Sequence, residues 1–335
     1  MPRKARIDAP GALQHIIFRG IEKRAIFADD TDYQRFLERL ATVLPETNTP
    51  CFAWALMPNH VHLLMKTGEI PISTIMRRLL TGYAVQFNRR HRRHGHLFQN
   101  RYRSFLCEEE KYFKELVRYL HLNPLRANVV HDFDALSNYP YCGHSVMLGN
   151  IERGWHDTDY VLQRFGTNVG QARKAYSAFV MKGIPLGRRP ELVGGGLVRS
   201  MGGWVALKEY RDSGRSVASD ERILGSGDFV KATLRQANEA MEKRGRARAK
   251  GLDLDQVKRC VADLVSVPCE TITSVGRKRK VALARSLICW FAVERLQMSA
   301  ADVARQLSLS PSAVSRLIDR GRNETLRFRV EESLL

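Results

Sequence analysis

The chain has 335 residues, with 54 Lys+Arg against 35 Asp+Glu, a formal charge of +19 and an isoelectric point of about 10.0. This length predicts two or three domains, and a hydrophobic content of 44% excludes a wholly disordered chain. The excess of positive charge favours a polyanionic partner, nucleic acid ahead of an anionic membrane surface. No apolar run reaches the roughly 18 residues of a membrane span, and none follows the basic N-terminus as a secretion signal would require. The six cysteines include no C-x-x-C pair, which favours a reducing compartment over a disulfide framework or a structural zinc site. We therefore expect a cytoplasmic, nucleoid-associated protein with no membrane partner.

The first 122 residues alternate between strand and helix patterns. The expected strands are Leu13–Arg19, Cys51–Met57, His60–Lys66 and Tyr102–Cys107. The expected helices are Asp29–Leu44, Ile72–Arg93 and Glu108–Leu122. The resulting order β-α-β-β-α-β-α predicts an α+β fold with a ferredoxin-like split βαβ antiparallel sheet.

The rest of the chain reads as a less regular middle followed by helices. Residues 140–155 read as an irregular connection, Asp157–Lys182 as a helix broken near Phe165-Gly166, and the Gly-rich residues 183–203 as a loop or hinge. Phe229–Arg248 is helical in pattern and turns strongly basic, as either a solvated helix end or a phosphate-tracking arm. Four helices follow, at Leu254–Val265, Arg279–Leu296, Ser299–Leu307 and Pro311–Arg320. We expect an N-terminal α+β domain over residues 1–145, a helical and loop-rich accessory region over 146–250, and an all-α domain over 251–330.

The motif Met57-Pro58-Asn59-His60-Val61-His62-Leu63-Leu64 places two histidines on one strand. Residues i and i+2 of a strand share a face, so His60 and His62 present two imidazoles side by side. Two neutral imidazoles on a rigid strand suit a divalent metal ion. The apolar neighbours Leu56, Val61, Leu63 and Leu64 predict that the opposite face packs in a core and that the histidine face is turned toward something polar. An isolated H-x-H pair is, however, equally typical of half-buried core histidines.

A second motif, Tyr119-Leu120-His121-Leu122-Asn123-Pro124, ends the helix expected at Glu108–Leu122. Tyr119 and Asn123 are four residues apart and share a helix face, and Pro124 disfavours helical geometry at the residue before it. Taken alone, the pair reads as a core tyrosine and a C-capping asparagine. Beside His60 and His62, it predicts three metal ligands with a tyrosine nucleophile next to them.

This residue set suits phosphoryl transfer. A phenol is a poor nucleophile while it is protonated, and a metal ion that binds the phosphate makes phosphorus more electrophilic. Attack by tyrosine would give a phosphotyrosine intermediate, which conserves bond energy for religation. Two ring nitrogens and one amide oxygen, completed by substrate oxygens and water, predict Mg²⁺ or Mn²⁺.

The residues between these two motifs are basic and contain no acid from 70 to 107. Cations for phosphates with rings for unpaired bases are typical of a groove that binds single strands or hairpins. The interleaved rings are those of Tyr83, Phe87, His91, His94, His96, Phe98 and Tyr102. The nucleic-acid-binding arginines predicted here are Arg77, Arg78, Arg89, Arg90, Arg92, Arg93, Arg101 and Arg103.

The first 140 or so residues resemble the HUH single-tyrosine transposases of the IS200-like type. Among these they are most similar to the REP-associated tyrosine transposases, through MPNHVHLL, GHLFQNRYRS and RYLHLNPLRANVV. The resemblance implies that His60, His62 and Asn123 are metal ligands and that Tyr119 is the nucleophile. It also implies Mg²⁺ or Mn²⁺ dependence and cleavage of single-stranded DNA at palindromic hairpins, leaving a 5′-phosphotyrosine and a free 3′-OH. Whether one chain or a homodimer completes the active site stays open at this point.

Residues Ser299–Arg320 have the pattern of a helix-turn-helix. Ser310, Ser312, Ser315 and Arg316 would face the major groove of duplex DNA. The wider stretch Thr271–Arg320 resembles the DNA-binding domain of the replication initiator DnaA, but it has Leu-Ser-Pro-Ser-Ala-Val in place of that family's signature. We therefore expect duplex binding without initiator-box specificity, helped by phosphate contacts from Arg277, Lys278, Arg279 and Lys280.

Two other functions fit parts of the sequence. A domesticated transposase without catalysis would bind DNA or RNA hairpins and act as a regulator. A helix-turn-helix regulator with a zinc-bound sensor domain would need a further ligand near His60 and His62, for which Cys51 or Cys107 could approach in the fold.

Overall fold

The computed structural model describes residues 7, 11–68, 70–187, 189, 192, 219–236, 251–274, 276, 278–296 and 298–335. The chain divides into two compact units, Met1–Thr233 and Leu234–Leu335, which are described separately. All six cysteines lie in the described part, and none forms a disulfide. No helix of that part is both long and apolar enough to cross a bilayer.

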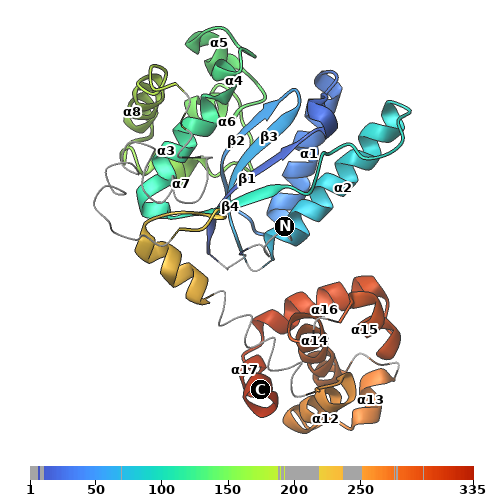
Figure 1. The fold of residues 1–335 in the computed structure, drawn as a ribbon. Coiled ribbons are helices and arrows are strands. Elements are labelled where there is room, and N and C mark those ends of the chain that lie inside the picture. The colour runs from blue at the N-terminus through green and yellow to red at the C-terminus, as the bar shows by residue number, and fades with distance from the viewer. Residues whose placement is uncertain are drawn as a thin grey trace. The chain divides into compact units, whose positions relative to one another are not determined.

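The first unit is built on a five-stranded sheet in the order β2-β3-β1-β4-β5 (Figure 1). The strands are β1 (Leu13–Arg19), β2 (Cys51–Met57), β3 (His60–Lys66), β4 (Arg103–Cys107) and β5 (Ile223–Leu224). β1 lies antiparallel between β3 and β4, and β2 pairs antiparallel with β3. The split βαβ topology predicted from the sequence is therefore confirmed, with β5 as an addition that the sequence pattern did not reveal.

One face of the sheet is covered by α1 (Asp30–Glu46) and α2 (Ile72–Arg90) (Figure 1). Asp29 caps α1, because its side chain accepts a hydrogen bond from the backbone N–H of Asp32 at 3.2 Å. Apolar residues at helical spacing on both helices meet the strand residues that point to this side, such as Ile16, Val61 and Leu63. They form the first core of the unit.

The opposite face carries a second core, under α3 (Glu109–His121). The helices that follow α3 are α4 (Asn123–Arg126), α5 (Phe133–Asn138), α6 (Gly143–Leu148), α7 (Thr158–Leu162) and α8 (Val169–Met181). The predicted break in Asp157–Lys182 is confirmed between α7 and α8, where Gly166 has a φ of +158°. The expectation of an irregular connection over 140–155 is wrong at α6, and α5 was not predicted.

β5 joins the sheet from a segment far along the chain. It pairs parallel to β4, and the carboxylate of Glu108 accepts hydrogen bonds from the backbone N–H of Ser226 (2.7 Å) and from its hydroxyl (3.2 Å). Glu108 is the N-cap residue of α3. Residues 227–236 then form a helix. Most of the expected hinge at 183–203 and the basic segment 243–250 lie outside the described residues.

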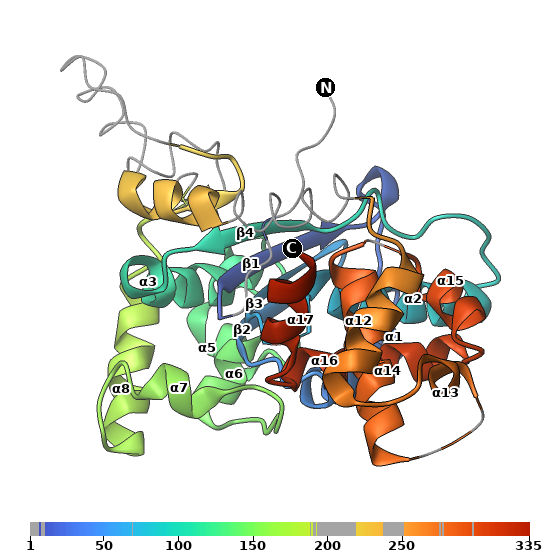
Figure 2. The same ribbon diagram turned by 90° about the horizontal axis from the view of Figure 1, so that it is seen from below.

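The second unit is all α in its described part. Its helices are α12 (Leu254–Val265), α13 (Cys269–Thr273), α14 (Arg279–Glu294), α15 (Ala300–Gln306), α16 (Pro311–Asn323) and α17 (Arg327–Leu334). α14 is the central helix: it packs against α12, α15 and α16 (Figure 2). The four predicted helices are confirmed to within three residues at each end, and α13 and α17 are additional.

Candidate functional site

His60 and His62 lie side by side on β3, with ring centroids 5.2 Å apart. They are on the face covered by α3, where Leu64 also packs in the second core. The prediction that this whole face is turned toward something polar is therefore wrong. It is apolar along most of the strand, and only the end near His60 is partly exposed, while His62 is 6% exposed.

One ring nitrogen of each histidine is held by a neighbour. His60 Nδ1 lies 2.7 Å from Asn59 Oδ1, and because an amide oxygen can only accept, Nδ1 carries the proton and Nε2 keeps a lone pair. His62 Nδ1 lies 3.0 Å from Nε2 of His15 on β1. Hydrogen bonds of this kind fix the orientation of metal-binding histidines.

Burial keeps both imidazoles neutral at pH 7. Loss of solvation, together with the positive charge of Arg19, lowers the pKa of His60 to about 4. Burial also lowers the pKa of His62 well below its ordinary value, as do the nearby His15, His60 and Arg19. Neutral imidazoles offer one lone pair each. It lies on Nε2 in His60, and it lies on Nε2 in His62 in the tautomer whose Nδ1–H donates to His15 Nε2, so this arrangement suits a metal ion.

Tyr119 from α3 reaches this pair. Its ring centroid is 6.3 Å from that of His62 and 6.3 Å from that of His15, in both cases edge to face. The guanidinium of Arg126 lies over the Tyr119 ring, 5.3 Å from its centroid. Half-buried Arg126 donates to the backbone oxygen of Gly183 at 3.3 Å, and burial lowers its pKa below the ordinary value. Tyr119 thus faces the histidines on one side and a cation on the other.

Asn123 begins α4, one turn after Tyr119. Leu122 between the two helices keeps helical dihedrals (φ −85°, ψ −6°), so Tyr119 and Asn123 remain on one side of the chain. Pro124 therefore sits in the first turn of a new helix, whereas the sequence pattern placed it at the end of the preceding one. Asn123 is 8% exposed, and its Nδ2 has no hydrogen-bond partner among the described residues. A buried N–H donor left unsatisfied by the protein suits an acceptor atom of a ligand, such as a phosphate oxygen, whereas a metal ion would take the amide oxygen.

The described residues contain no cluster of three or more His, Cys, Asp or Glu side chains placed to hold a metal ion. Cys51 packs in the first core, on the side of the sheet away from the histidines. Cys107 is in the second core but pairs with Leu13, at the other end of β1 from Arg19 and His60. Neither cysteine of the zinc-sensor alternative therefore lies beside the histidine pair. The ligand set predicted from the sequence is His60, His62 and the amide oxygen of Asn123.

The arginines predicted to bind nucleic acid differ in how exposed their side chains are and in whether they already contact other side chains. Six are exposed, and they are Arg77, Arg78, Arg89, Arg92, Arg101 and Arg103. Arg78 forms an ion pair with Glu46. Arg93 donates to Asn88 at 3.4 Å and lies over the ring of Phe87.

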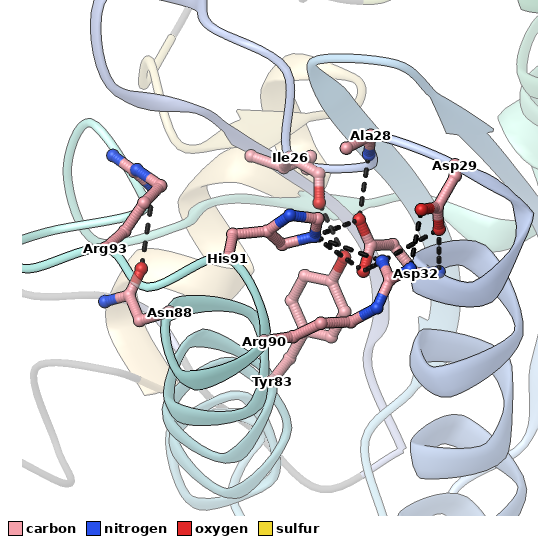
Figure 3. Close-up of polar contacts among 9 residues, drawn as sticks. All are labelled: Ile26, Ala28, Asp29, Asp32, Tyr83, Asn88, Arg90, His91 and Arg93. Atoms are coloured by element: carbon pink, nitrogen blue, oxygen red, sulfur yellow. Dashed lines mark hydrogen bonds and ion pairs between the residues drawn. The ribbon is translucent and has the colours of Figure 1, made fainter.

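Arg90 is occupied by two carboxylates (Figure 3). It binds Asp29 at 2.6 Å and Asp32 at 2.7 Å, and the 1% exposed carboxylate of Asp32 also binds His91 Nε2 at 2.8 Å. These ion pairs raise the pKa of Arg90. They join the end of α2 to the start of α1, so the structure gives Arg90 a role in holding the two helices together.

The rings expected to stack on bases are largely internal. Tyr83, Phe87 and Tyr102 are at most 7% exposed and pack in the first core. That expectation is wrong for these three residues, because their helix and strand positions point toward α1 and the sheet. The exposed rings of the window are those of His94 and His96.

The second unit contains the two expected helices, α15 and α16. Ser312, Ser315 and Arg316 are exposed on α16. The hydroxyl of Ser310 accepts a hydrogen bond from the backbone N–H of Ala313 at 3.2 Å. Ser310 therefore caps the N-terminus of α16 and stabilises that helix.

The basic segment before α14 is shaped by a buried arginine. Arg285 is 9% exposed and donates from Nε to the backbone oxygen of Ile272 at 2.7 Å and from Nη1 to that of Gly276 at 2.9 Å. Lys278, Arg279 and Lys280 are exposed just after this loop. Arg277 lies outside the described residues.

Sequence reasoning missed three residues near the histidines, namely His15, Arg19 and Arg126. The strand alternation that pairs His60 with His62 also puts His15 on the inner face of β1, but which strands are neighbours decides whether the faces meet. Arg126 lies in the run RYLHLNPLRANVV, and its contact with Tyr119 depends on the turn between α3 and α4.

Comparison with known proteins finds a family model that matches the part of the chain with this geometry. The family model described as "Transposase IS200 like" matches residues 11–123, which include His60, His62, Tyr119 and Asn123. A solved structure of a REP-associated tyrosine transposase bound to a REP hairpin is 19% identical, with a TM-score of 0.38 over 50% of this chain and 93% of that chain. No curated protein matches the chain.

The resemblance of residues 271–320 to the DnaA domain stays a prediction.

The family model spans β1 to the first residue of α4, and therefore covers every element that contributes to the histidine and tyrosine cluster. Residues 11–123, which carry the histidine and tyrosine cluster, are thus similar to the IS200-like transposase family.

Proposed function

We propose that the first unit is a metal-dependent nuclease and strand transferase that cuts and rejoins single-stranded DNA at hairpins through a 5′-phosphotyrosine. The observation that carries this proposal is the meeting of Tyr119 with His62, at a ring distance of 6.3 Å, beside a second histidine with a free lone pair. A lone histidine pair or a lone tyrosine would not suggest this chemistry.

The roles follow from the donor atoms. His60 Nε2, His62 Nε2 and the side-chain oxygen of Asn123 would hold Mg²⁺ or Mn²⁺, since these ions accept hard oxygen and imidazole ligands. The ion would supply Lewis-acid activation of the phosphate. Asn59 and His15 keep the two rings oriented through their hydrogen bonds.

In the chemical step, Tyr119 Oη would attack phosphorus and the bond from phosphorus to the 3′ oxygen would break. The phenol gives up its proton to solvent, and the leaving 3′ oxygen takes one up as the free 3′-OH. The phosphotyrosine then accepts attack by a 3′-OH in the reverse sense, which releases the tyrosine and joins two strands.

Tyr119, His60 and His62 come from one chain, so we infer that the active site is completed in cis. A homodimer is then not needed for chemistry. The exposed arginines at both ends of the 70–107 window would bind the phosphates of the hairpin.

We further propose that α15 and α16 bind duplex DNA. Arg316 is exposed on α16 beside Ser312 and Ser315, and no ion pair of the described residues includes it. When a protein neutralises Z phosphates of duplex DNA, the logarithm of its binding constant falls linearly with the logarithm of the salt concentration. The slope is about −0.9Z.

For the full chain on a blunt duplex, Arg316→Ala is expected to weaken binding about ten-fold, the loss typical of one specific arginine contact to DNA. Fluorescence anisotropy over a range of salt concentrations measures it. Arg329→Ala is the matched control, because Arg329 is an exposed arginine on α17, outside the two helices. Equal loss in both variants would contradict the assignment of α16.

The test of the catalytic proposal is to incubate the chain with end-labelled single-stranded DNA carrying a hairpin and Mn²⁺. A labelled protein species that survives denaturation is the expected result, and it should disappear when EDTA is added. Hairpin binding with no such species would favour the alternative, a domesticated transposase that acts as a regulator.

A further inference from the structure

Arg19 stands directly beside the histidine pair. It is the last residue of β1 and is paired with His60 across the antiparallel β1–β3 ladder. Directly paired residues project from the same face of a sheet, with Cβ atoms about 4.5–5.5 Å apart. The Arg19 side chain therefore leaves the sheet on the side of His60, at the partly exposed end of the site.

The backbone around Arg19 is held on both sides. Its carbonyl accepts a hydrogen bond from the N–H of Gln99, and the N–H of Gly20 donates to the carbonyl of Asn59, both at 2.9 Å. Gly20 leaves no room for a side chain, because a Cβ there would lie 2.1 Å from the backbone oxygen of Arg24. Asn59 is also the residue that orients His60, so one residue fixes the positions of both Arg19 and His60.

No described residue neutralises the charge of Arg19. Arg19 is exposed, and no ion pair within the described part of the chain includes it. Arg24, five residues later, differs: it binds Glu22 at 2.9 Å. A fixed cation beside a cation-binding site calls for an anionic ligand that bridges the two.

We propose that Arg19 is a substrate-binding residue of this site, whose guanidinium binds a non-bridging oxygen of the phosphate that Tyr119 attacks. This inference rests on the proposed function. A guanidinium forms charge-assisted hydrogen bonds to phosphate oxygens, and these strengthen as charge develops on the phosphate during the reaction. Its direct pairing with His60 distinguishes Arg19 from the arginines of α2. Arg103 on β4 pairs with Ile17 and projects from the same face, but it lies one strand farther from His60.

The experiment compares Arg19→Gln and Arg19→Lys with Arg24→Gln, a matched control on the same turn. Adduct formation is timed with Mn²⁺ on a hairpin substrate with a normal scissile phosphate and on one with a methylphosphonate there, which removes the negative charge. On the normal substrate Arg19→Gln is expected to slow the reaction about 100-fold, with partial rescue in Arg19→Lys and no change in Arg24→Gln. On the methylphosphonate substrate the rates of adduct formation of the wild type and Arg19→Gln should differ by less than about three-fold, because the Arg19 guanidinium then has no negatively charged phosphate to bind.

A second readout does not depend on activity. Removing a fixed positive charge near the two histidines should tighten Mn²⁺ binding by the DNA-free chain about two- to five-fold in Arg19→Gln, measured by electron paramagnetic resonance of free Mn²⁺. A purely structural role for Arg19 would weaken metal binding instead.

The outcomes separate the two proposals. A wild-type chain that forms no adduct would overturn both the proposed function and this inference. A wild-type adduct with an unchanged rate in Arg19→Gln would overturn the Arg19 assignment alone. An equal loss on both substrates would also overturn it, since Arg19 would then act elsewhere than on the scissile phosphate.

Discussion

Replacing Tyr119 with Phe is expected to abolish the covalent protein–DNA adduct while hairpin affinity stays within about two-fold. The substitution removes only Oη, and the ring keeps its packing against His15 and His62 and its contact with Arg126. Loss of a nucleophile typically costs a factor of 10³ or more in rate, so we expect at least a ~1,000-fold fall. Denaturing gels of labelled hairpin DNA measure the adduct, and gel shifts measure binding.

Tyr112→Phe is the matched control for this result. Tyr112 is on the same helix but is buried in the second core, so its hydroxyl is not expected to reach DNA. An adduct that persists in Tyr119→Phe and disappears in Tyr112→Phe or Tyr102→Phe would show that the nucleophile is another tyrosine.

The second large effect is expected for His60→Ala. Loss of one of the three proposed protein ligands should reduce Mn²⁺-dependent cleavage by at least about 100-fold, since even the partners that orient metal ligands are worth 10–100-fold. Cleavage rates as a function of Mn²⁺ concentration measure this loss, and the binding of Mn²⁺ without DNA should weaken in parallel.

His131→Ala serves as the control for His60, because His131 is an exposed histidine in the same unit and away from the sheet. Unchanged cleavage and unchanged Mn²⁺ binding in His60→Ala would remove the case for a metal site on β3.

The sheet and its helices were predictable because their signals are local. Each of β1, β2 and β3 begins and ends at the predicted residue, since apolar and β-branched runs are bounded by Gly20 and by Pro58-Asn59. Asp29 at the start of α1 is a similarly local signal. The same holds for His60, His62, Tyr119 and Asn123, which could be proposed from strand alternation and helical spacing.

What the sequence could not reveal depends on contacts between distant residues. The two residues of β5 form a strand because β4 lies beside them, more than 100 positions earlier. Asp32 neutralises Arg90 from 58 positions away, so a window free of acids in sequence is not free of them in space. Helical spacing likewise does not tell whether the aromatic face of α2, with Tyr83 and Phe87, contacts DNA or packs against α1. In the structure this face packs in the first core.

The attachment of β5 sets a lower limit on the length of a fragment that keeps the proposed site intact. A chain that stopped at residue 123, where the family model ends, would leave the hydrogen-bonding edge of β4 bare and open to pairing with other chains. It would also remove α8, whose Tyr176 hydroxyl lies 2.7 Å from Nδ1 of His121 at the end of the helix that carries Tyr119. The matched segment thus holds the reactive groups, but the polypeptide that keeps them in place continues for about another hundred residues.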